Sequence, residues 1–285
     1  MDREVSRLVG ASIARMPGSV IEQLLGMRRR IGSFNAARGL RTALLYSGGW
    51  FVQWHEGPAE AVELTWSISR THDGHSHPRV VHRSAGPAAL REPVQVAALV
   101  GSDKASDMAR RLFDLEHEHE AGPLEPAEVW RRLAAPPSGR FAHGTGAEPH
   151  RAIAVTSEFT ESIELVRALA EHGRVPVNYQ RLAGPDPHAA DAGAAYVDVG
   201  SWGRRTRVQA LSRHVLGLGI ARFSFSRIDA VVLLANRRPE SALGLQGAVG
   251  PFLGAVRPEP ELHVFGLDGR SHLAAALELV ERLHA

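Results

Sequence analysis

The sequence contains no cysteine. Disulfides, thiolate nucleophiles and zinc sites built on sulfur ligands are therefore excluded. Lysine is scarce too, since Lys104 is the one lysine among 33 basic residues, which face 31 acidic residues. The resulting formal charge of +2 gives no electrostatic basis for binding nucleic acid or an acidic membrane surface.

Long apolar runs are also lacking, and no stretch reaches the length of a membrane-spanning helix. The first residues, Met1-Asp2-Arg3-Glu4, do not show the basic-then-apolar order of a signal peptide. We therefore expect a cytoplasmic, soluble protein without membrane attachment. The 285 residues, 44% of them hydrophobic, suffice for about two domains with their own cores.

The most informative stretch is a predicted β-hairpin. Thr42–Tyr46 and Trp50–His55 are rich in aliphatic and aromatic residues, and Ser47-Gly48-Gly49 supplies the positive φ angles of a tight turn. Along the second strand, alternation places tryptophans on one face and Gln53 on the other. We expect a helix or a partner to cover at least one of these faces.

The elements around this hairpin predict a ferredoxin-like α+β sandwich for residues 1–100. We expect a helix from Val20, preceded by Ser19 as its N-cap, with the arginines 28–30 on its solvent side. The other expected elements are a strand at Val5–Ala11, a helix at Ala59–Arg70, a loop at Thr71–Pro78, and strands at Arg79–Arg83 and Val94–Val100.

Two amphipathic helices at Asp103–His119 and Pro126–Leu133 are predicted to form a helical cap, residues 101–134, on this first domain. Residues 135–149 are rich in proline, glycine, alanine and serine, which indicates a linker. The domain boundary is predicted there.

Residues 150–285 alternate between predicted strands and helices, which favours a three-layer α/β domain of the P-loop-GTPase or flavodoxin-like kind. Strands are expected at Ala152–Thr156, Val175–Leu182, Ala194–Val199, Ala230–Ala235 and Leu262–Phe265. Helices are expected at Thr160–His172, Glu240–Leu253 and Ser271–His284, and Arg205–Leu218 as a helix or partly ordered segment.

The hairpin stretch resembles the BLUF domain, a flavin-based blue-light sensor. The resemblance rests on Asn35-Ala36-Ala37-Arg38, on the Ala-Leu-Leu-Tyr-Ser strand at 43–47, and on the run Phe-Val-Gln-Trp-His-Glu-Gly at 51–57. It covers about the first 100 residues and implies FAD as cofactor. By resemblance Asn35 and Gln53 bind the isoalloxazine edge, and Arg38 and Arg91 match basic positions of the flavin site. It also implies a homodimer and a regulatory protein partner.

Four positions depart from the family pattern, and one of them is Phe34, where the antirepressor subgroup of the family has a histidine beside the asparagine. The redox-active tyrosine should stand two residues before Ser12, where this chain has Gly10. The family's tryptophan and methionine on the last strand fall at about Gln95 and Ala97. Because glycine has no phenol, we expect the standard photochemistry to be lost, while flavin binding through Asn35 and Gln53 stays open.

The second half more weakly resembles a small Ras-like GTPase without its nucleotide machinery. A phosphate-binding loop needs Gly-x-x-x-x-Gly-Lys-Ser/Thr, and with Ser162 as its last residue the other three positions hold Val155, Thr160 and Glu161. A carboxylate in place of lysine repels a triphosphate, so we expect no hydrolysis. The run 196–203 is similar to the glycine-bearing second switch, and Phe-Gly-Leu-Asp at 265–268 replaces the guanine-reading Asn-Lys-x-Asp. An unrelated flavodoxin-like domain stays the alternative.

Two histidine groups, one at 72, 75 and 77 and one at 117 and 119, are candidate metal ligands. Residues 117 and 119 of a helix point to different sides, and nothing fixes the loop histidines, so no metal site and no catalytic residues are predicted. The favoured function is therefore a non-enzymatic sensory or regulatory protein. The alternatives are an FAD photoreceptor with Trp50 or Trp54 as electron donor, and a nucleotide-binding enzyme that uses the second domain.

Overall fold

The computed structural model describes residues 4–100, 104–118, 124–135, 151–158, 160–184, 186, 192–200, 206–224, 228–236, 239–253, 259–267, 274, 277–278 and 280–282. The chain divides into two compact units. The first holds Met1–Pro137 with the later segments Arg181–Asp191 and Leu218–Ser224, and the second holds the remainder. The linker predicted at 135–149 lies, apart from residue 135, outside the described residues.

The first unit contains a mixed sheet in the order β5-β2-β3-β1-β4. Its strands are β1 (Glu4–Ala14), β2 (Arg41–Ser47), β3 (Trp50–Gly57), β4 (His75–Pro87) and β5 (Val94–Val100). β2 and β5 are parallel, and the pairs β2–β3, β1–β3 and β1–β4 are antiparallel. The expected order of strand, helix, two strands, helix and two strands is observed.

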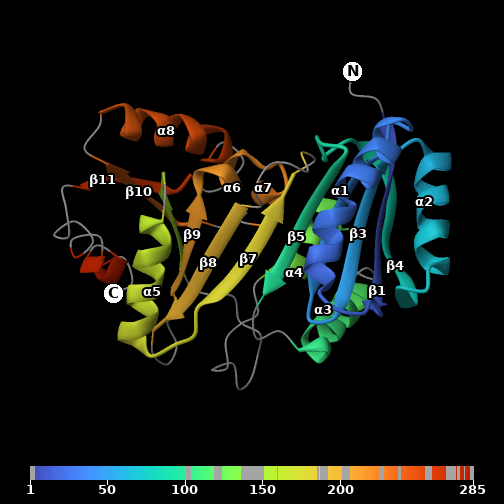
Figure 1. The fold of residues 1–285 in the computed structure, drawn as a ribbon, viewed down its shortest axis with the longest axis horizontal. Coiled ribbons are helices and arrows are strands. Elements are labelled where there is room, and N and C mark those ends of the chain that lie inside the picture. Colours follow the sequence, from blue (N-terminus) through green and yellow to red (C-terminus); the bar gives the residue numbers. More distant parts are fainter. Residues whose placement is uncertain are drawn as a thin grey trace. The chain divides into compact units, whose positions relative to one another are not determined.

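Helices cover both faces of this sheet (Figure 1). α1 (Val20–Ala36) and α2 (Ala59–Thr71) pack on one face, where Leu24 and Val62 are buried against strand residues. α3 (Ala105–Glu118) and α4 (Pro126–Ala134) pack on the other, where Trp130 of α4 lies 6.1 Å from Trp54 of β3 between ring centroids. The expectation that helices cover a face of the hairpin is confirmed.

The local signals at the hairpin and at α1 are borne out. Gly48 and Gly49 adopt φ angles of 55° and 81°, as the tight turn requires. Ser19 caps α1, and its hydroxyl accepts a hydrogen bond from the backbone N–H of Glu22 at 3.3 Å. The predicted solvent side is wrong for Arg28, which is 6% exposed and donates to the carbonyls of Leu25 and of 184 and 186.

The predicted loop Thr71–Pro78 is wrong in its second half, because β4 already begins at His75. The start of β4 is hard to recognise in the sequence because its pairing with β1 is irregular. β4 shifts register twice against β1, and His77 has a positive φ of 50°. Such irregularities break the simple alternation by which a strand is recognised in a sequence.

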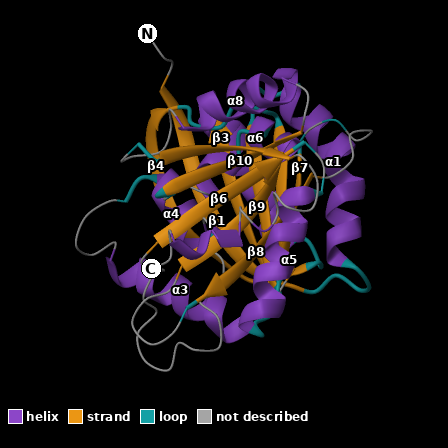
Figure 2. Ribbon diagram, turned by 90° about the vertical axis from the view of Figure 1, so that its left-hand side faces the viewer, coloured by secondary structure: helices purple, strands orange, loops and turns teal. Residues whose placement is uncertain are grey.

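The second unit contains a sheet in the order β11-β10-β6-β9-β8. The strands are β6 (Arg151–Ser157), β8 (Ala192–Val199), β9 (Thr206–Ser212), β10 (Ala230–Asn236) and β11 (Glu261–Leu267), and β7 spans Asn178–Ala183. All pairs are parallel except β8–β9, which is antiparallel. Figure 2 shows β6, β8, β9 and β10 with α5 (Glu161–Gly173) beside them.

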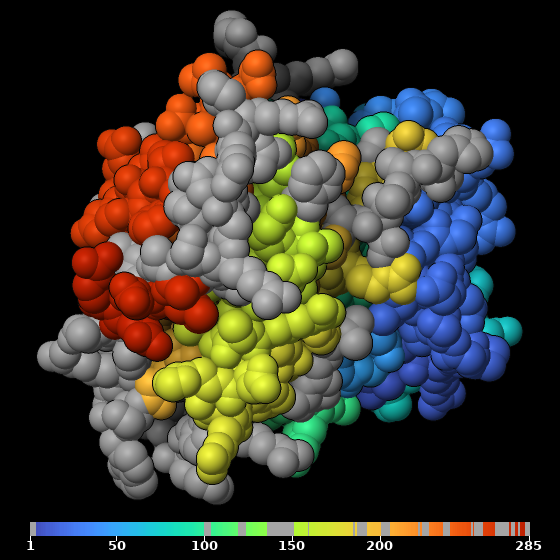
Figure 3. All heavy atoms as spheres, turned by 60° about the vertical axis from the view of Figure 1, so that its left-hand side comes forward, coloured from blue at the N-terminus to red at the C-terminus, as the bar shows by residue number. Residues whose placement is uncertain are grey.

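The core of this unit lies between the sheet and α5, whose residues Leu165, Val166 and Leu169 are buried against β-strand valines and alanines. The outer side of α5 is exposed, as Figure 3 shows in yellow-green. The other helices are α6 (Arg213–Gly217), α7 (Ala221–Ser224, counted with the first unit) and α8 (Pro239–Leu253). The expected helix at 271–284 is described only in part, and no described helix is long and apolar enough to cross a membrane.

The expectation of a helical or partly ordered segment at Arg205–Leu218 is wrong, because residues 206–212 form β9 and only the short α6 follows. The sequence did not indicate β9 because this central strand carries a charged residue, Arg207. Arg207 is buried and pairs with Asp198 opposite it on β8 through contacts of 2.7 and 2.8 Å. A bidentate partner makes a buried guanidinium tolerable, but the partner becomes visible only once the strands are paired.

Candidate functional site

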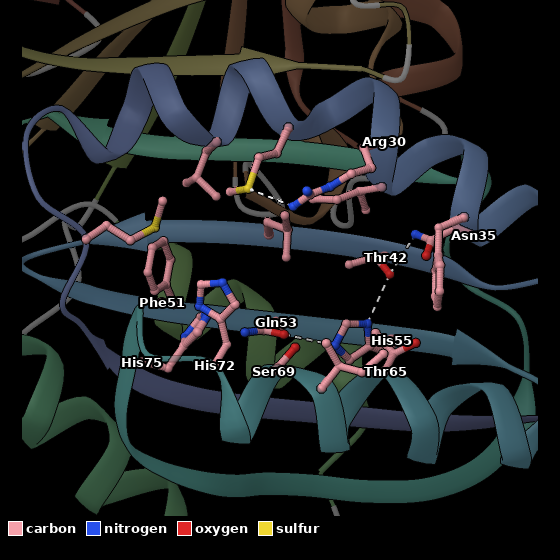
Figure 4. Close-up of a pocket in the computed structure, with 17 residues that line it drawn as sticks. Arg30, Asn35, Thr42, Phe51, Gln53, His55, Thr65, Ser69, His72 and His75 are labelled. Carbon is pink, nitrogen blue, oxygen red and sulfur yellow. Dashed lines mark hydrogen bonds between the residues drawn. The ribbon is translucent and has the colours of Figure 1, made fainter.

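A cavity of about 340 Å³ lies between α1, α2 and the sheet of the first unit (Figure 4). Apolar side chains form most of its walls, among them Leu24, Ile31 and Phe34 of α1, Leu44 and Phe51 of the sheet, and Ile68 of α2. Its volume is in the range of small-molecule sites, which are mostly apolar with a few placed polar groups. The cleft between the two helices is therefore open rather than filled by side chains.

A chain of hydrogen bonds runs along one wall of the cavity (Figure 4). The Asn35 amide donates to the hydroxyl of Thr42 at 3.0 Å, and that hydroxyl lies 3.0 Å from Nδ1 of His55. Nε2 of His55 lies 3.2 Å from Oε1 of Gln53. Both residues predicted to bind a ligand edge are thus in the pocket lining, joined through two residues that the sequence alone had not singled out.

The paired strands explain how these residues meet. Thr42 lies opposite His55 in the β2–β3 register, and Leu44 lies opposite Gln53, so all four side chains share the face that α1 and α2 cover. Asn35 reaches the same wall from the last turn of α1. A polar pair at facing hairpin positions is the sequence signal that could have revealed Thr42 and His55.

One acceptor in this wall has no partner. The Nδ2 group of Asn35 also donates to the backbone carbonyl of Pro93 at 2.7 Å, which uses its second proton. Oδ1 of Asn35 is buried and has no hydrogen-bond partner among the described residues. An unpaired buried carbonyl costs about 1–3 kcal/mol, so a donor brought to this oxygen would stabilise the wall.

His55 is uncharged in this setting. It is 1% exposed, and burial lowers its pKa from 6.5 to about 4. At neutral pH the ring therefore carries one proton and can donate from one nitrogen while it accepts at the other.

The position opposite Gln53 on β1 is Gly10. A Cβ atom built on Gly10 would lie 2.3 Å from a ring carbon of Trp66, a buried residue of α2. The indole of Trp66 thus occupies the space that a side chain at position 10 would need. Glycine at this point is therefore required by the packing of α2 on β1.

Histidines stand at another part of the lining. His75 Nδ1 is 2.8 Å from the hydroxyl of Ser12, and the rings of His72 and His75 are 5.8 Å apart. Burial, and then the neighbouring His72, lower the pKa of His75. No group of three or more potential metal ligands occurs among the residues that the structure describes, so His77 and the other histidines assemble no metal centre there.

The other predicted positions lie elsewhere. Arg38 stacks 3.8 Å above the Phe34 ring and donates to the Phe34 carbonyl, and neither it nor Arg91 is part of the described lining. Gln95 and Ala97 lie beside Ala43 and Leu45 in the β2–β5 register. They therefore share the face of Trp54, away from the cavity.

The two tryptophans suggested as alternative electron donors are also on that far face. The Trp50 ring nitrogen donates to the carbonyl of Ala105 at 3.1 Å, and Trp54 packs against Trp130 and, at 5.1 Å, against Phe223. Trp50 and Trp54 thus lie on the face of the sheet opposite Gln53, as the alternation along the strand predicts. Trp66 is the tryptophan on the side of the sheet that carries the cavity.

In the second unit the residues at the positions of a phosphate-binding loop bond to each other. The Ser157 hydroxyl donates to that of Ser162 at 3.0 Å and accepts from the Ser162 N–H, also at 3.0 Å. Glu161 is the first residue of α5. Asp198, predicted near a second switch, lies on the antiparallel strand β8 and is paired with Arg207.

No family model matches the chain, and a search of curated proteins finds no significant match. Solved structures that it resembles include the BLUF protein BlrB in its dark state, at 25% identity over 47% of this chain and 96% of that chain, with a TM-score of 0.31. The photo-activated state of BlsA matches at 16% identity over 45% of this chain and 91% of that chain, with a TM-score of 0.32. Klebsiella pneumoniae BlrP1 with FMN and cyclic diGMP matches at 17% identity over 96% of this chain and 74% of that chain, with a TM-score of 0.31. A bacterial light-regulated adenylyl cyclase matches at 18% identity over 41% of this chain and 35% of that chain, with a TM-score of 0.33. The match therefore spans about a third of that chain.

Proposed function

We propose that the first unit is a BLUF-like sensory module whose pocket binds the isoalloxazine ring of FAD, and that the chain signals by protein contact without catalysis of its own. The observation that carries the proposal is the polar wall of an otherwise apolar cavity, where Oδ1 of Asn35 lacks a partner among the described residues and Gln53 lines the same cavity at the other end of the hydrogen-bonded chain. Flavin, when bound, supplies absorption of blue light and an electron acceptor.

The residues fit such a ring. One edge of an isoalloxazine offers an N–H donor next to carbonyl and ring-nitrogen acceptors, and the pocket wall offers the Asn35 carbonyl and the Gln53 amide. Apolar side chains from α1, α2 and the sheet would bury the flat faces of the ring and exclude water.

The proposed module lacks the standard photochemical partner. Gly10 faces Gln53 across β1 and β3, and Trp66 fills the space above Gly10. No phenol can therefore supply an electron and a proton at this position. We infer that the pocket serves ligand sensing, or a light response weaker than that of tyrosine-bearing relatives.

The second unit is proposed to be a Ras-like scaffold that acts through protein contact. The order β11-β10-β6-β9-β8, with β8 as the single antiparallel strand, supports this because strand order and direction correspond to the Ras-like sheet. Glu161 in place of lysine, and Ser162 bonded to Ser157, leave little to hold a phosphate. A regulatory protein partner, a homodimer and a cytoplasmic location complete the proposal.

Flavin uptake by the purified full chain tests the pocket. FAD added to colourless protein is expected to bind, with quenched flavin fluorescence, and Asn35→Ala combined with Gln53→Leu should weaken binding at least tenfold. Gln246→Leu, an exposed position on α8, is the matched control and should bind as the wild type does. A wild-type protein that leaves FAD fluorescence unchanged would remove the flavin from the proposal.

Two further measurements address light and nucleotides. A flavin-loaded protein whose absorption shifts to the red under blue light, by the amount usual for tyrosine-bearing BLUF domains, would contradict the loss of photochemistry. Calorimetric titration with GTP and with ATP, each with Mg²⁺, is expected to give no binding heat. Micromolar affinity for either would favour the nucleotide-binding alternative.

A further inference from the structure

The direction of the hydrogen bonds in the pocket wall can be derived from one fixed point. The backbone carbonyl of Pro93 can only accept a hydrogen bond, and it lies 2.7 Å from the Asn35 amide. Nδ2 of Asn35 must therefore face Pro93, and its second proton goes to the Thr42 hydroxyl at 3.0 Å. Asn35 has no freedom to exchange its oxygen and nitrogen.

The Thr42 hydroxyl, having accepted from Asn35, still has its own proton to place. Among the described residues, Nδ1 of His55 at 3.0 Å is the acceptor within its reach. Nδ1 is then unprotonated. Because the deeply buried ring is neutral, its one proton lies on Nε2, which faces Oε1 of Gln53 at 3.2 Å.

These hydrogen-bond directions fix the orientation of the Gln53 side-chain amide. Its oxygen is turned toward His55, so its NH₂ group is the part left for the cavity. Were Gln53 to turn over alone, its N–H would meet the N–H of His55, which is a repulsive contact between two donors. The reversed amide is accommodated only when the ring proton lies on Nδ1 and the Thr42 hydroxyl points elsewhere. The two arrangements contain the same protons and differ in their sites.

We propose that His55 is the positioning residue of this pocket: its Nε2–H holds the Gln53 amide with NH₂ toward the ligand, and Gln53 reverses only together with the His55 tautomer. The wall thereby selects a planar ligand edge that presents an acceptor to Gln53 and a donor to Asn35. The ligand preference rests on the proposed flavin function, whereas the coupling of His55 to Gln53 belongs to the chain itself.

Nitrogen NMR of the ligand-free full chain tests the coupling. In protein with ¹⁵N-labelled histidine, two-bond proton–nitrogen correlations are expected to show His55 with a protonated Nε2 and a bare Nδ1 at neutral pH. Thr42→Val removes the donor to Nδ1, so the tautomer population should shift measurably toward Nδ1–H. Ser84→Ala, beside His82 at 2.7 Å, is the matched control and should leave the His55 signals unchanged.

A wild-type His55 protonated on Nδ1, or a Thr42→Val protein with an unchanged tautomer, would overturn the proposal. A second measurement concerns the ligand, for which His55→Leu leaves Gln53 without its donor. FAD affinity should fall roughly fivefold, as expected for one neutral hydrogen bond, and the infrared carbonyl bands of the bound flavin should shift. An unchanged affinity and band would contradict the positioning role. A wild-type chain that binds no FAD but shows the expected tautomers would refute the flavin function and leave the coupling standing.

Discussion

Glycine is required at position 10 because the Trp66 ring packs directly against its backbone. The ring of Trp66 lies where the first carbon of any side chain at position 10 would be. In a buried strand such a conflict is relieved by moving the indole or the helix that carries it, and overpacking of this kind costs about 1–3 kcal/mol.

We predict that Gly10→Ala lowers the free energy of unfolding by about that amount, measured by urea denaturation. In the background of Trp66→Ala, which vacates the space, the same substitution should cost much less. Gly26→Ala is the control, because nothing lies within 4 Å of its added carbon and alanine favours the helix. Equal costs of Gly10→Ala in the two backgrounds would show that Trp66 is not the obstacle.

The buried His55 makes stability depend on pH in a defined direction. Its pKa is about 4 in the folded chain and 6.5 when exposed, so the unfolded state binds the proton more readily. The stabilisation is present above pH 6.5 and is lost as the pH falls through 6.5 toward 4, by up to about 3 kcal/mol.

Urea denaturation of wild type and His55→Leu at pH 7 and at pH 4.5 measures this contribution as a difference. The wild type should lose more stability than the variant. The difference is needed because Glu56 acts in the opposite sense: burial raises its pKa despite N–H groups that donate to it from Ala89 and Leu90. Identical losses of unfolding free energy in the two proteins would show that protonation of His55 does not destabilise the fold.

Among the elements, α4 packs on the first unit through a buried face whose largest side chain is Trp130. Trp130 is fully buried and packs against Trp54 of β3, on the face opposite the cavity. Its helix is short, and short helices are stabilised by packing more than by their own hydrogen bonds. The helical cap and the strand that carries Gln53 are therefore joined at this contact.

Trp130→Ala is predicted to cost about 3–5 kcal/mol of unfolding free energy and to speed amide hydrogen exchange in α4 before it does so in α1. Phe113→Ala on α3 is the control, since that side chain is 56% exposed. Protection of α4 that stays at the wild-type level would show that Trp130 does not hold the helix.

For the whole molecule, the compact units do not coincide with the order of the chain. Arg181–Asp191 and Leu218–Ser224 are counted with the first unit although the second surrounds them in sequence. Arg28 illustrates the consequence, because its buried guanidinium donates to the carbonyls of residues 184 and 186, at 3.4 and 3.3 Å.

A fragment of residues 1–137 is therefore predicted to be less stable than the same unit within the full chain, measured by thermal denaturation. It lacks two acceptors of Arg28 and the Phe223 ring that packs on Trp54. Arg28→Met should partly restore the fragment, because it removes a charge that has lost two of its three carbonyl acceptors, and should destabilise the full chain. A fragment as stable as the full-length unit would show that the later segments contribute nothing.

The sequence by itself determined most regular elements of the first unit and the resemblance at the hairpin. Alternation, the two glycines and the serine cap act over a few residues, so they are visible in the chain as written. The position of Asn35 and Gln53 in one pocket followed from a resemblance and not from such local signals. Strands with irregular register or a buried ion pair, β4 and β9, were misjudged because their partners are far away in sequence.

Tertiary structure alone decided what surrounds Gln53. The hydrogen-bonded wall needs β2, β3, the end of α1 and the Pro93 carbonyl together, and no spacing in the sequence announces that meeting. The same holds for Trp66, which lies 56 positions after Gly10 and fills the space above it only because α2 packs on β1. Local patterns set which strand carries each residue, and long-range packing set which atoms face each other.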